Sequence, residues 1–200
     1  MKNIFTFYIL LLLGFFLNAQ NLKSPDNNLD LNFSIDEKGR AFYSLNFHDK
    51  PVILNSGLGF MLKDNVEWMK IDTLDMMNNF KILNVTFDSV DEYWNPVWGE
   101  ESEIRNNYNE MFVELQQIES ERKVNIRFRL FDDSLGFRYE FPLQEKLGSF
   151  IIIDEKTEFA MAGDHTAMWI PGDYDTQEYN YTTSKLSEIE QKSIEFKEEN

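Results

Sequence analysis

Apolar and polar residues alternate strictly along several short stretches of this chain. The two clearest stretches place apolar side chains at Leu29, Leu31, Phe33 and Ile35, and at Val124, Ile126, Phe128 and Leu130. A period of two puts all the apolar side chains of a β-strand on one face. Strands with one apolar and one polar face are typical of antiparallel sheets that cover a core on one side. The alternation therefore predicts antiparallel strands.

Turn-forming residues separate these stretches from further strand candidates. Residues 37–40 and 48–51 flank an alternating stretch at 41–47, which predicts hairpins, and residues 55–59 predict a break before a short strand at 60–62. The other candidates are residues 81–87, 109–116, 137–141 and 150–153. The last is a continuous apolar run, which predicts a strand buried on both faces. No convincing helical period precedes Lys185, and residues 182–200 are interpreted as a weak helix or a frayed tail. The expected fold class is all-β, a large antiparallel β-sandwich.

The amino terminus has the pattern of a secretory signal. Lys2 supplies a positive charge, a mostly apolar run covers residues 4–17, and Ala19 is a small residue at the expected cleavage point. An uncleaved anchor is the alternative, but the run is shorter than the roughly 20 residues of a spanning helix. We therefore expect export, periplasmic or extracellular, with cleavage near Ala19 and no stable membrane insertion.

Composition limits the remaining possibilities. Removal of the signal leaves about 180 residues, the size of one domain. With no cysteine, the exported domain has no disulfide, so its stability must come from its core, a bound ion or a neighbouring domain. The net charge of −16 argues against nucleic acid and anionic membranes as partners, and is compatible with a neutral ligand or a cation.

Few residues offer nucleophilic catalysis. The chain has no thiol and two histidines, and His48 lies in a predicted turn beside Asp49 and Lys50, where a solvated side chain is expected. No glycine-rich phosphate loop is present, and His165 is the other imidazole. Carboxylates are too numerous for a glycosidase pair to be chosen by counting.

The stretch from residue 164 to 181 is rich in acidic and aromatic residues. Asp173, Asp175 and Glu178 could offer oxygens to Ca²⁺, although their spacing is not that of an EF-hand, and as a self-contained site a solvated loop is the favoured interpretation. Tryptophan rings stack on sugars, and the candidates in loop-like contexts are Trp94, Trp98 and Trp169. For any one of them, packing is the more common role.

Five motifs in order carry a family resemblance. They are Trp-Asn-Pro-Val-Trp-Gly-Glu at 94–100, Ile-Arg-Asn-Asn-Tyr-Asn-Glu at 104–110, Arg-Phe-Arg-Leu-Phe-Asp-Asp at 127–133, Gly-Phe-Arg-Tyr-Glu-Phe-Pro at 136–142, and Trp-Ile-Pro-Gly-Asp-Tyr at 169–174 leading to Glu178-Tyr179. The series resembles the amino-terminal domain of glycoside hydrolase family 97, which contains α-glucosidases and α-galactosidases, over roughly residues 21–188. Asn107 departs from the pattern, because the family often has His there.

The resemblance implies a galactose-mutarotase-like β-sandwich that precedes a catalytic (β/α)8 barrel. The family's acid and its base or nucleophile come from the barrel, which this chain lacks, so the chain is expected to be inactive alone. The family's Tyr-x-x-x-Glu-Tyr stretch supplies a calcium ligand, which matches Glu178 here. The candidate substrate-binding residues are Trp169, Asp175 and Tyr179, with an α-glucoside or α-galactoside as the carbohydrate partner.

The expected organisation is a signal peptide at 1–19, a truncated sandwich domain at 20–188 and an unrelated or frayed polar tail at 189–200. Two alternatives remain open. One is a free-standing carbohydrate-binding module without hydrolase activity. The other is a mutarotase-like epimerase, whose chemistry would need a histidine base and a glutamate.

Overall fold

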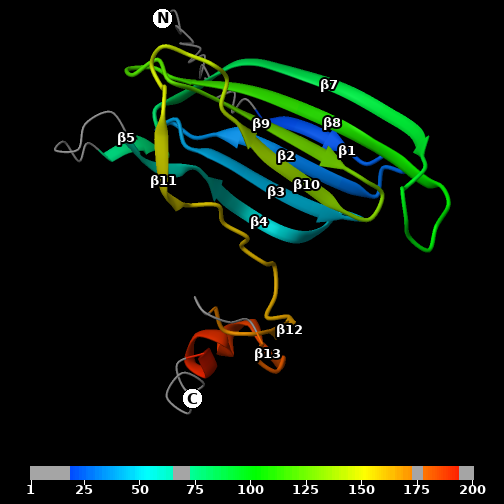
Figure 1. Cartoon of the computed structure of the whole chain (residues 1–200). Coiled ribbons are helices and arrows are strands. Elements are labelled where there is room, and N and C mark those ends of the chain that lie inside the picture. Colours follow the sequence, from blue (N-terminus) through cyan, green and yellow to red (C-terminus); the bar gives the residue numbers. More distant parts are fainter. Residues whose placement is uncertain (1–18, 65–72, 173–177, 194–200) are drawn as a thin grey trace, which may run out of the picture.

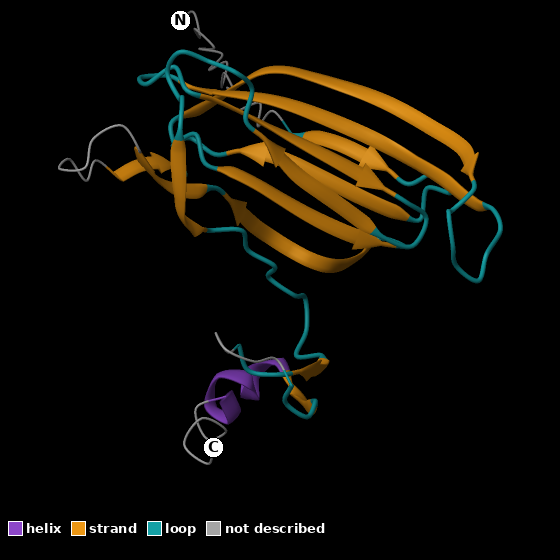
Figure 2. Ribbon diagram, viewed as in Figure 1, coloured by secondary structure: helices purple, strands orange, loops and turns teal. Residues whose placement is uncertain are grey.

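The computed structural model describes residues 19–64, 73–172 and 178–193, and two four-stranded antiparallel sheets form its main body (Figure 1). The first sheet has the order β1-β2-β3-β4, with β1 at Gln20–Lys23, β2 at Leu29–Ile35, β3 at Ala41–Phe47 and β4 at Lys50–Leu58. The second has the order β10-β9-β8-β7, with β7 at Phe80–Trp94, β8 at Ile104–Gln117, β9 at Lys123–Leu130 and β10 at Leu135–Glu140. The two sheets lie face to face, as Figure 2 shows.

The core lies between these sheets and is built from the alternating residues. Along β9 every second side chain from Val124 to Leu130 is buried, and β2 shows the same alternation. Phe128 of the second sheet packs on Phe33 and Tyr43 of the first, with ring centroids 5.8 and 6.4 Å apart. The prediction of an all-β antiparallel sandwich is confirmed.

The first sheet departs from expectation at β4. A two-residue turn at His48 and Asp49, with φ of 46° and 62°, joins β3 to β4, as tight hairpins require. The break expected over residues 55–59 is confined to Gly59, because β4 continues to Leu58, which pairs with Ala41, and the predicted short strand then begins at Phe60. The strand ends only at Gly59, whose φ of 154° favours glycine and where a Cβ would lie 2.8 Å from a backbone oxygen. Ladder pairing with β3 outweighs the turn-prone composition of this stretch.

Strands β7 and β8 are much longer than the predicted 81–87 and 109–116. They pair with each other from Phe80↔Gln117 to Trp94↔Ile104, whereas β9 pairs with β8 only from Asn109 onward. The hairpin therefore extends past its neighbours as a two-stranded arm, at the right of Figure 1. Apolar periodicity marks strands that face a core, so the sequence pattern did not show this extension.

A third, smaller sheet has the order β11-β5-β6, with β5 at Phe60–Asp64, β6 at Thr73–Met76 and β11 at Phe150–Glu155. The expectation that residues 150–153 are buried on both faces is wrong. Ile151, Ile152 and Ile153 are 47%, 49% and 51% exposed. The reason is that β11 is the edge strand of this sheet and carries a register irregularity between Ile152 and Asp154.

The chain after β11 leaves the sandwich in two steps. Residues 156–162 run along β4, where Leu54 N donates to Ala160 O at 2.7 Å and Ala162 N donates to Val52 O at 3.0 Å. A two-stranded sheet of β12, Thr166–Trp169, and β13, Thr182–Lys185, follows, and then a 3-10 turn, Leu186–Glu188, that continues as helix over residues 189–193. The weak helix or tail expected at 182–200 is thus helical only over residues 186–193, because residues 182–185 form β13. In the described parts of the chain, no helix is long and apolar enough to cross a membrane.

Candidate functional site

The acidic and aromatic stretch predicted from the sequence forms the β12–β13 unit and its connecting loop. Asp164 begins the unit and accepts hydrogen bonds from the backbone N and the Oγ of Ser187, both at 3.0 Å. The bond from the Ser187 backbone, followed by the other contacts, holds the pKa of Asp164 below its usual value. The next residue, His165, is exposed, and its backbone oxygen accepts a bond from Leu186 N at 3.0 Å. Asp164 therefore anchors the helical end of the chain.

Trp169 is the last residue of β12, where the sequence suggested a loop. It pairs with Thr182 of β13, and its indole Nε1 donates to Ser184 Oγ at 3.0 Å. Ser184 is buried and donates in turn to the backbone oxygen of Lys185 at 2.9 Å. The indole N–H is thus hydrogen-bonded within the β12–β13 unit, so a ligand would contact Trp169 through the faces of its ring.

The remaining candidates lie in or beside the β12–β13 loop. Asp173 and Asp175 fall within residues 173–177, outside the described residues. Glu178 is exposed and Tyr179 is half-buried, and both lie on the described return of the loop toward β13. The predicted substrate-binding roles of Trp169, Asp175 and Tyr179 remain predictions.

Calcium needs six to eight oxygen ligands, and a carboxylate supplies at most two. Within the described residues, no group of three His, Cys, Asp or Glu side chains lies close enough to hold a metal ion. A calcium site that includes Glu178 would therefore need ligands from outside the described residues, and the role of Glu178 stays a prediction.

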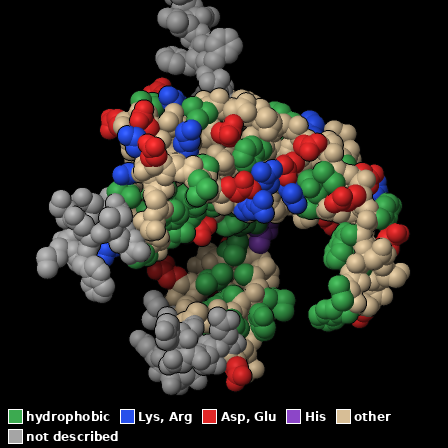
Figure 3. Space-filling model, turned by 45° about the horizontal axis from the view of Figure 1, so that its top comes forward, with side chains coloured by type: hydrophobic (Ala, Val, Ile, Leu, Met, Phe, Trp, Pro, Cys, Tyr) green, Lys and Arg blue, Asp and Glu red, His purple; other side chains and the backbone are tan. Residues whose placement is uncertain are grey.

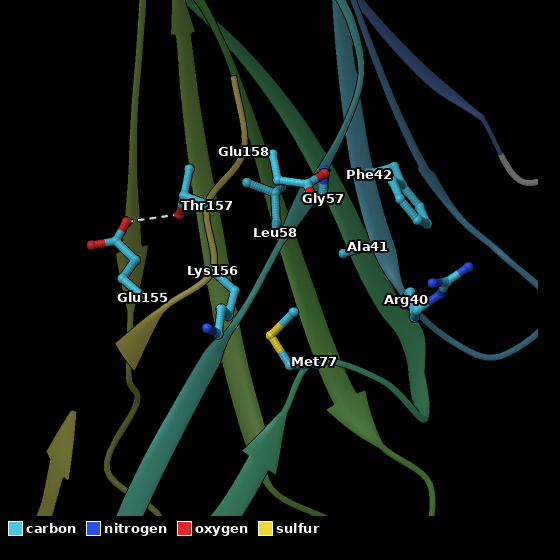
Figure 4. Close-up of a pocket in the computed structure, with 10 residues that line it drawn as sticks. All are labelled: Arg40, Ala41, Phe42, Gly57, Leu58, Met77, Glu155, Lys156, Thr157 and Glu158. Atoms are coloured by element: carbon cyan, nitrogen blue, oxygen red, sulfur yellow. Dashed lines mark hydrogen bonds between the residues drawn. The ribbon is translucent and has the colours of Figure 1, made fainter. Parts of the chain in front are cut away.

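A hollow of about 350 Å³ lies at the edge where residues 155–158 pass between the sheets (Figure 4). Tyr43 of the first sheet donates its hydroxyl to the backbone oxygen of Glu158 at 2.8 Å. The hydroxyl oxygen of Tyr139, in the second sheet, lies 2.8 Å from Thr157 Oγ1. Thr157 Oγ1 donates a hydrogen bond to Glu155 Oε1 at 2.7 Å, which is the dashed line in Figure 4. Residues 157 and 158 are thus bonded to β3 of the first sheet and to β10 of the second.

The ionisable groups of this hollow are occupied by structural contacts. Glu158 Oε2 accepts a hydrogen bond from the backbone N of Gly57 at 2.7 Å, and Lys156 is paired with Asp154. Burial raises the pKa of Tyr43 and of Tyr139 to about 12, so both hydroxyls stay protonated at neutral pH. Glu155 and Glu158 each accept a hydrogen bond within the chain, so they do not form a free acid–base pair.

Two features outside the predicted site were not singled out by sequence patterns. Glu110 bridges Arg127 and Arg129 on the outer face of the second sheet, and Glu140 bridges Arg127 and Arg138. Figure 3 shows basic and acidic side chains interleaved in one cluster on the face turned to the viewer. Cross-strand register makes the pairs of Glu110 with Arg127 and Arg129 and of Glu140 with Arg127, so local spacing in the sequence could not have indicated them, whereas Arg138 and Glu140 are two residues apart on β10.

The tryptophans expected in loops separate into two places. Trp94 ends β7 and is 49% exposed, and Trp98 lies in the loop of the β7–β8 arm and is 89% exposed. Trp169 belongs to the β12–β13 unit. The structure thus brings two of the three candidate sugar-stacking rings onto one element.

The fold is that of a two-sheet β-sandwich domain with a small β12–β13 unit after it. The chain belongs to the family of glycosyl-hydrolase 97 N-terminal domains, whose family model matches residues 22–197. This confirms the resemblance drawn from the five motifs.

Named relatives agree with this assignment. The chain is 25% identical over 187 residues to the retaining alpha-galactosidase of Bacteroides thetaiotaomicron. The aligned region covers 88% of this chain and 25% of that protein. The chain is 35% identical to a glycoside hydrolase family 97 enzyme from Pseudoalteromonas, solved in complex with panose and with acarbose, with a TM-score of 0.73 over 84% of this chain and 24% of that one. A beta-arabinopyranosidase, 22% identical with a TM-score of 0.68, shares the fold over 82% of this chain and 26% of its own. The chain therefore spans about a quarter of the length of these relatives.

Proposed function

We propose that this chain acts as the amino-terminal domain of an exported, calcium-dependent α-glycoside hydrolase. The observation that carries the proposal is the family match over residues 22–197, in a chain that spans about a quarter of its relatives. The sandwich would brace a catalytic barrel and line one side of its active site. By the family resemblance, the catalytic acid and base would belong to that barrel.

The substrate class is an α-glucoside or an α-galactoside. One relative is named a retaining alpha-galactosidase, and another was solved with panose and acarbose. The choice between the two sugars would depend on residues of the barrel.

Glu178 is proposed to contribute one carboxylate to a shared calcium ion. Its support is its position: it is exposed on the described return of the β12–β13 loop, and it matches the glutamate of the motif. A hard cation next to a substrate would orient and polarise sugar oxygens when bound. The chain's own contribution is to hold Glu178 on a loop whose base is closed by the β12–β13 pairing.

Export is proposed from the amino-terminal signal pattern, which lies almost wholly outside the described residues. Strand β1 begins at Gln20, so cleavage after Ala19 would leave the whole strand intact. Pairing of β1 with β2, from Gln20↔Phe33 to Lys23↔Asp30, would then be available to the mature chain.

Two measurements test the proposal. The purified chain with calcium should give no turnover of aryl α-glucosides or α-galactosides above the buffer rate. Turnover at about 1 per second or faster, the ordinary range for an enzyme, would show that the chain carries its own catalytic groups.

The calcium role is tested by nuclear magnetic resonance. Calcium should shift the backbone amide resonances of Glu178 and Tyr179, with weak affinity because the ligands of the barrel would be missing. Glu178→Gln should abolish those shifts, and Glu119→Gln, an exposed carboxylate on the β8–β9 turn, should leave them unchanged. Equal calcium shifts in the wild type and in Glu178→Gln would refute the role of Glu178.

A further inference from the structure

We propose that the end of the β7–β8 arm, residues 91–105, is a binding platform for neutral sugars. The inference arises because this arm carries large apolar side chains without a core to bury them. Strand β9 ends its pairing with β8 at Asn109, so beyond this point β7 and β8 contact only each other within the ladder. Two paired strands alone bury little apolar surface.

The exposed apolar side chains of the arm are large and mostly aromatic. The exposed fractions are 61% for Tyr93, 49% for Trp94, 99% for Val97, 89% for Trp98 and 37% for Ile104. Figure 3 shows hydrophobic side chains gathered on the arm that projects at the right. A gathering of exposed apolar surface on a soluble protein marks a contact site more often than chance exposure does.

Polar bonds on the arm keep its shape without using these rings. Arg105 donates from Nε and Nη2 to the two carboxylate oxygens of Asp91, at 2.7 and 2.8 Å. Asn106 donates to Glu92 at 3.0 Å, and Asn95 closes the loop by donating to the backbone oxygen of Ser102 at 2.8 Å. The tryptophan rings are therefore held on a preorganised scaffold, which lowers the entropic cost of binding.

The charges around the rings indicate the class of ligand. Glu100, Glu101 and Glu103 are exposed in the loop, and Arg105, the one Lys or Arg in the sequence between residues 91 and 105, is paired with Asp91. This acidic surrounding disfavours phosphates, carboxylates and nucleic acid. It favours a ligand with apolar C–H faces and many hydroxyl donors, because indole rings stack on the faces and carboxylates accept the hydroxyls. A neutral oligosaccharide has this chemistry.

The experiment uses indole Nε1–H resonances of the purified chain during titration with panose. Panose at about 10 mM should shift the indole resonances of Trp94 and Trp98, with a Kd near 1 mM, on the order of the weakest specific affinities. Trp98→Ala should raise the Kd about tenfold, equivalent to roughly 1.4 kcal/mol. Phe87→Ala removes a 54% exposed ring on the same β7 strand outside the arm, and should leave the Kd unchanged.

Three outcomes would overturn the proposal. They are Trp94 and Trp98 resonances that stay fixed, equal Kd values for Trp98→Ala and the wild type, and a sugar-independent shift of Trp98 that grows with protein concentration. The last result would assign the arm to a contact between copies of the chain. Trp98→Ala leaves Glu178 intact, so its effect on panose binding and the calcium test of Glu178 can fail independently.

Discussion

Replacement of Glu110 tests whether the charge cluster on the outer sheet face stabilises the sandwich. The Glu110 side chain is 11% exposed and bridges two arginines of β9. Its Oε2 accepts from Arg129 Nε at 2.8 Å, and its Oε1 accepts from Arg127. Both guanidinium groups also lie over aromatic rings, Arg127 at 4.3 Å from the Phe112 centroid and Arg129 at 4.4 Å from that of Tyr108.

The magnitude follows from these contacts. A hydrogen bond to a charged group contributes about 1.5–3 kcal/mol, so two would contribute about 3–6 kcal/mol if fully shielded. Arg129 has 42% of its side chain exposed, which screens its share strongly. Glutamine keeps the shape and one acceptor. We therefore expect Glu110→Gln to lower the free energy of unfolding by about 2 kcal/mol.

Urea unfolding followed by circular dichroism measures this loss. With an m value of about 2 kcal/mol per molar, the midpoint should fall by about 1 M while m stays constant. The matched control is Glu114→Gln, on the same strand and four ladder positions away, which should change stability by less than about 0.5 kcal/mol. Equal midpoints for the two variants would refute the reasoning, because the bridging geometry would then contribute nothing.

Three further perturbations follow from the structure. Gly59→Ala should destabilise the chain by about 1–3 kcal/mol, since its φ of 154° is strained for alanine and the added Cβ would lie 2.8 Å from a backbone oxygen; thermal unfolding that matches the wild type would contradict this. Hydrogen bonding from Arg127, then from other neighbours, holds the pKa of Glu140 below its ordinary 4.5, so its contribution to stability should be present above pH 4.5 and disappear as the pH falls through the lowered value. Urea midpoints measured over this range should therefore fall less steeply in Glu140→Gln than in the wild type. Trp169→Phe removes the indole donor to Ser184 and should cost the β12–β13 unit about 1 kcal/mol, which is measurable as faster amide exchange in β13; unchanged exchange would show that the bond contributes nothing.

The sandwich was predictable where strands face its core. Phe33 and Phe128 follow the alternation and meet across the two sheets. The same reasoning failed for β11, because a continuous apolar run indicates burial without indicating what would cover it, and this strand lies at an edge. It also missed the arm beyond Asn109, whose strands are held by cross-strand polar bonds and show no regular alternation of apolar and polar residues.

The candidate site, too, was predicted from the sequence only in part. The sequence located the acidic and aromatic stretch and, by resemblance, Glu178. It named Trp94, Trp98 and Trp169 as candidate sugar-stacking rings, and the fold separates them, because the first two lie on the β7–β8 arm and the third is bonded to Ser184 in another sheet.

Taken alone, the sequence determined the strand periodicity, the all-β class, the acidity, the absence of disulfides and the family. Each of these depends on local spacing or on composition, which a linear chain displays directly. The tertiary structure decided which strand is an edge, where β4 ends, how Glu110 joins Arg127 and Arg129, and which rings share an element. Those outcomes depend on register between residues distant in sequence, which the hydrogen-bonded ladders of the folded sheets establish.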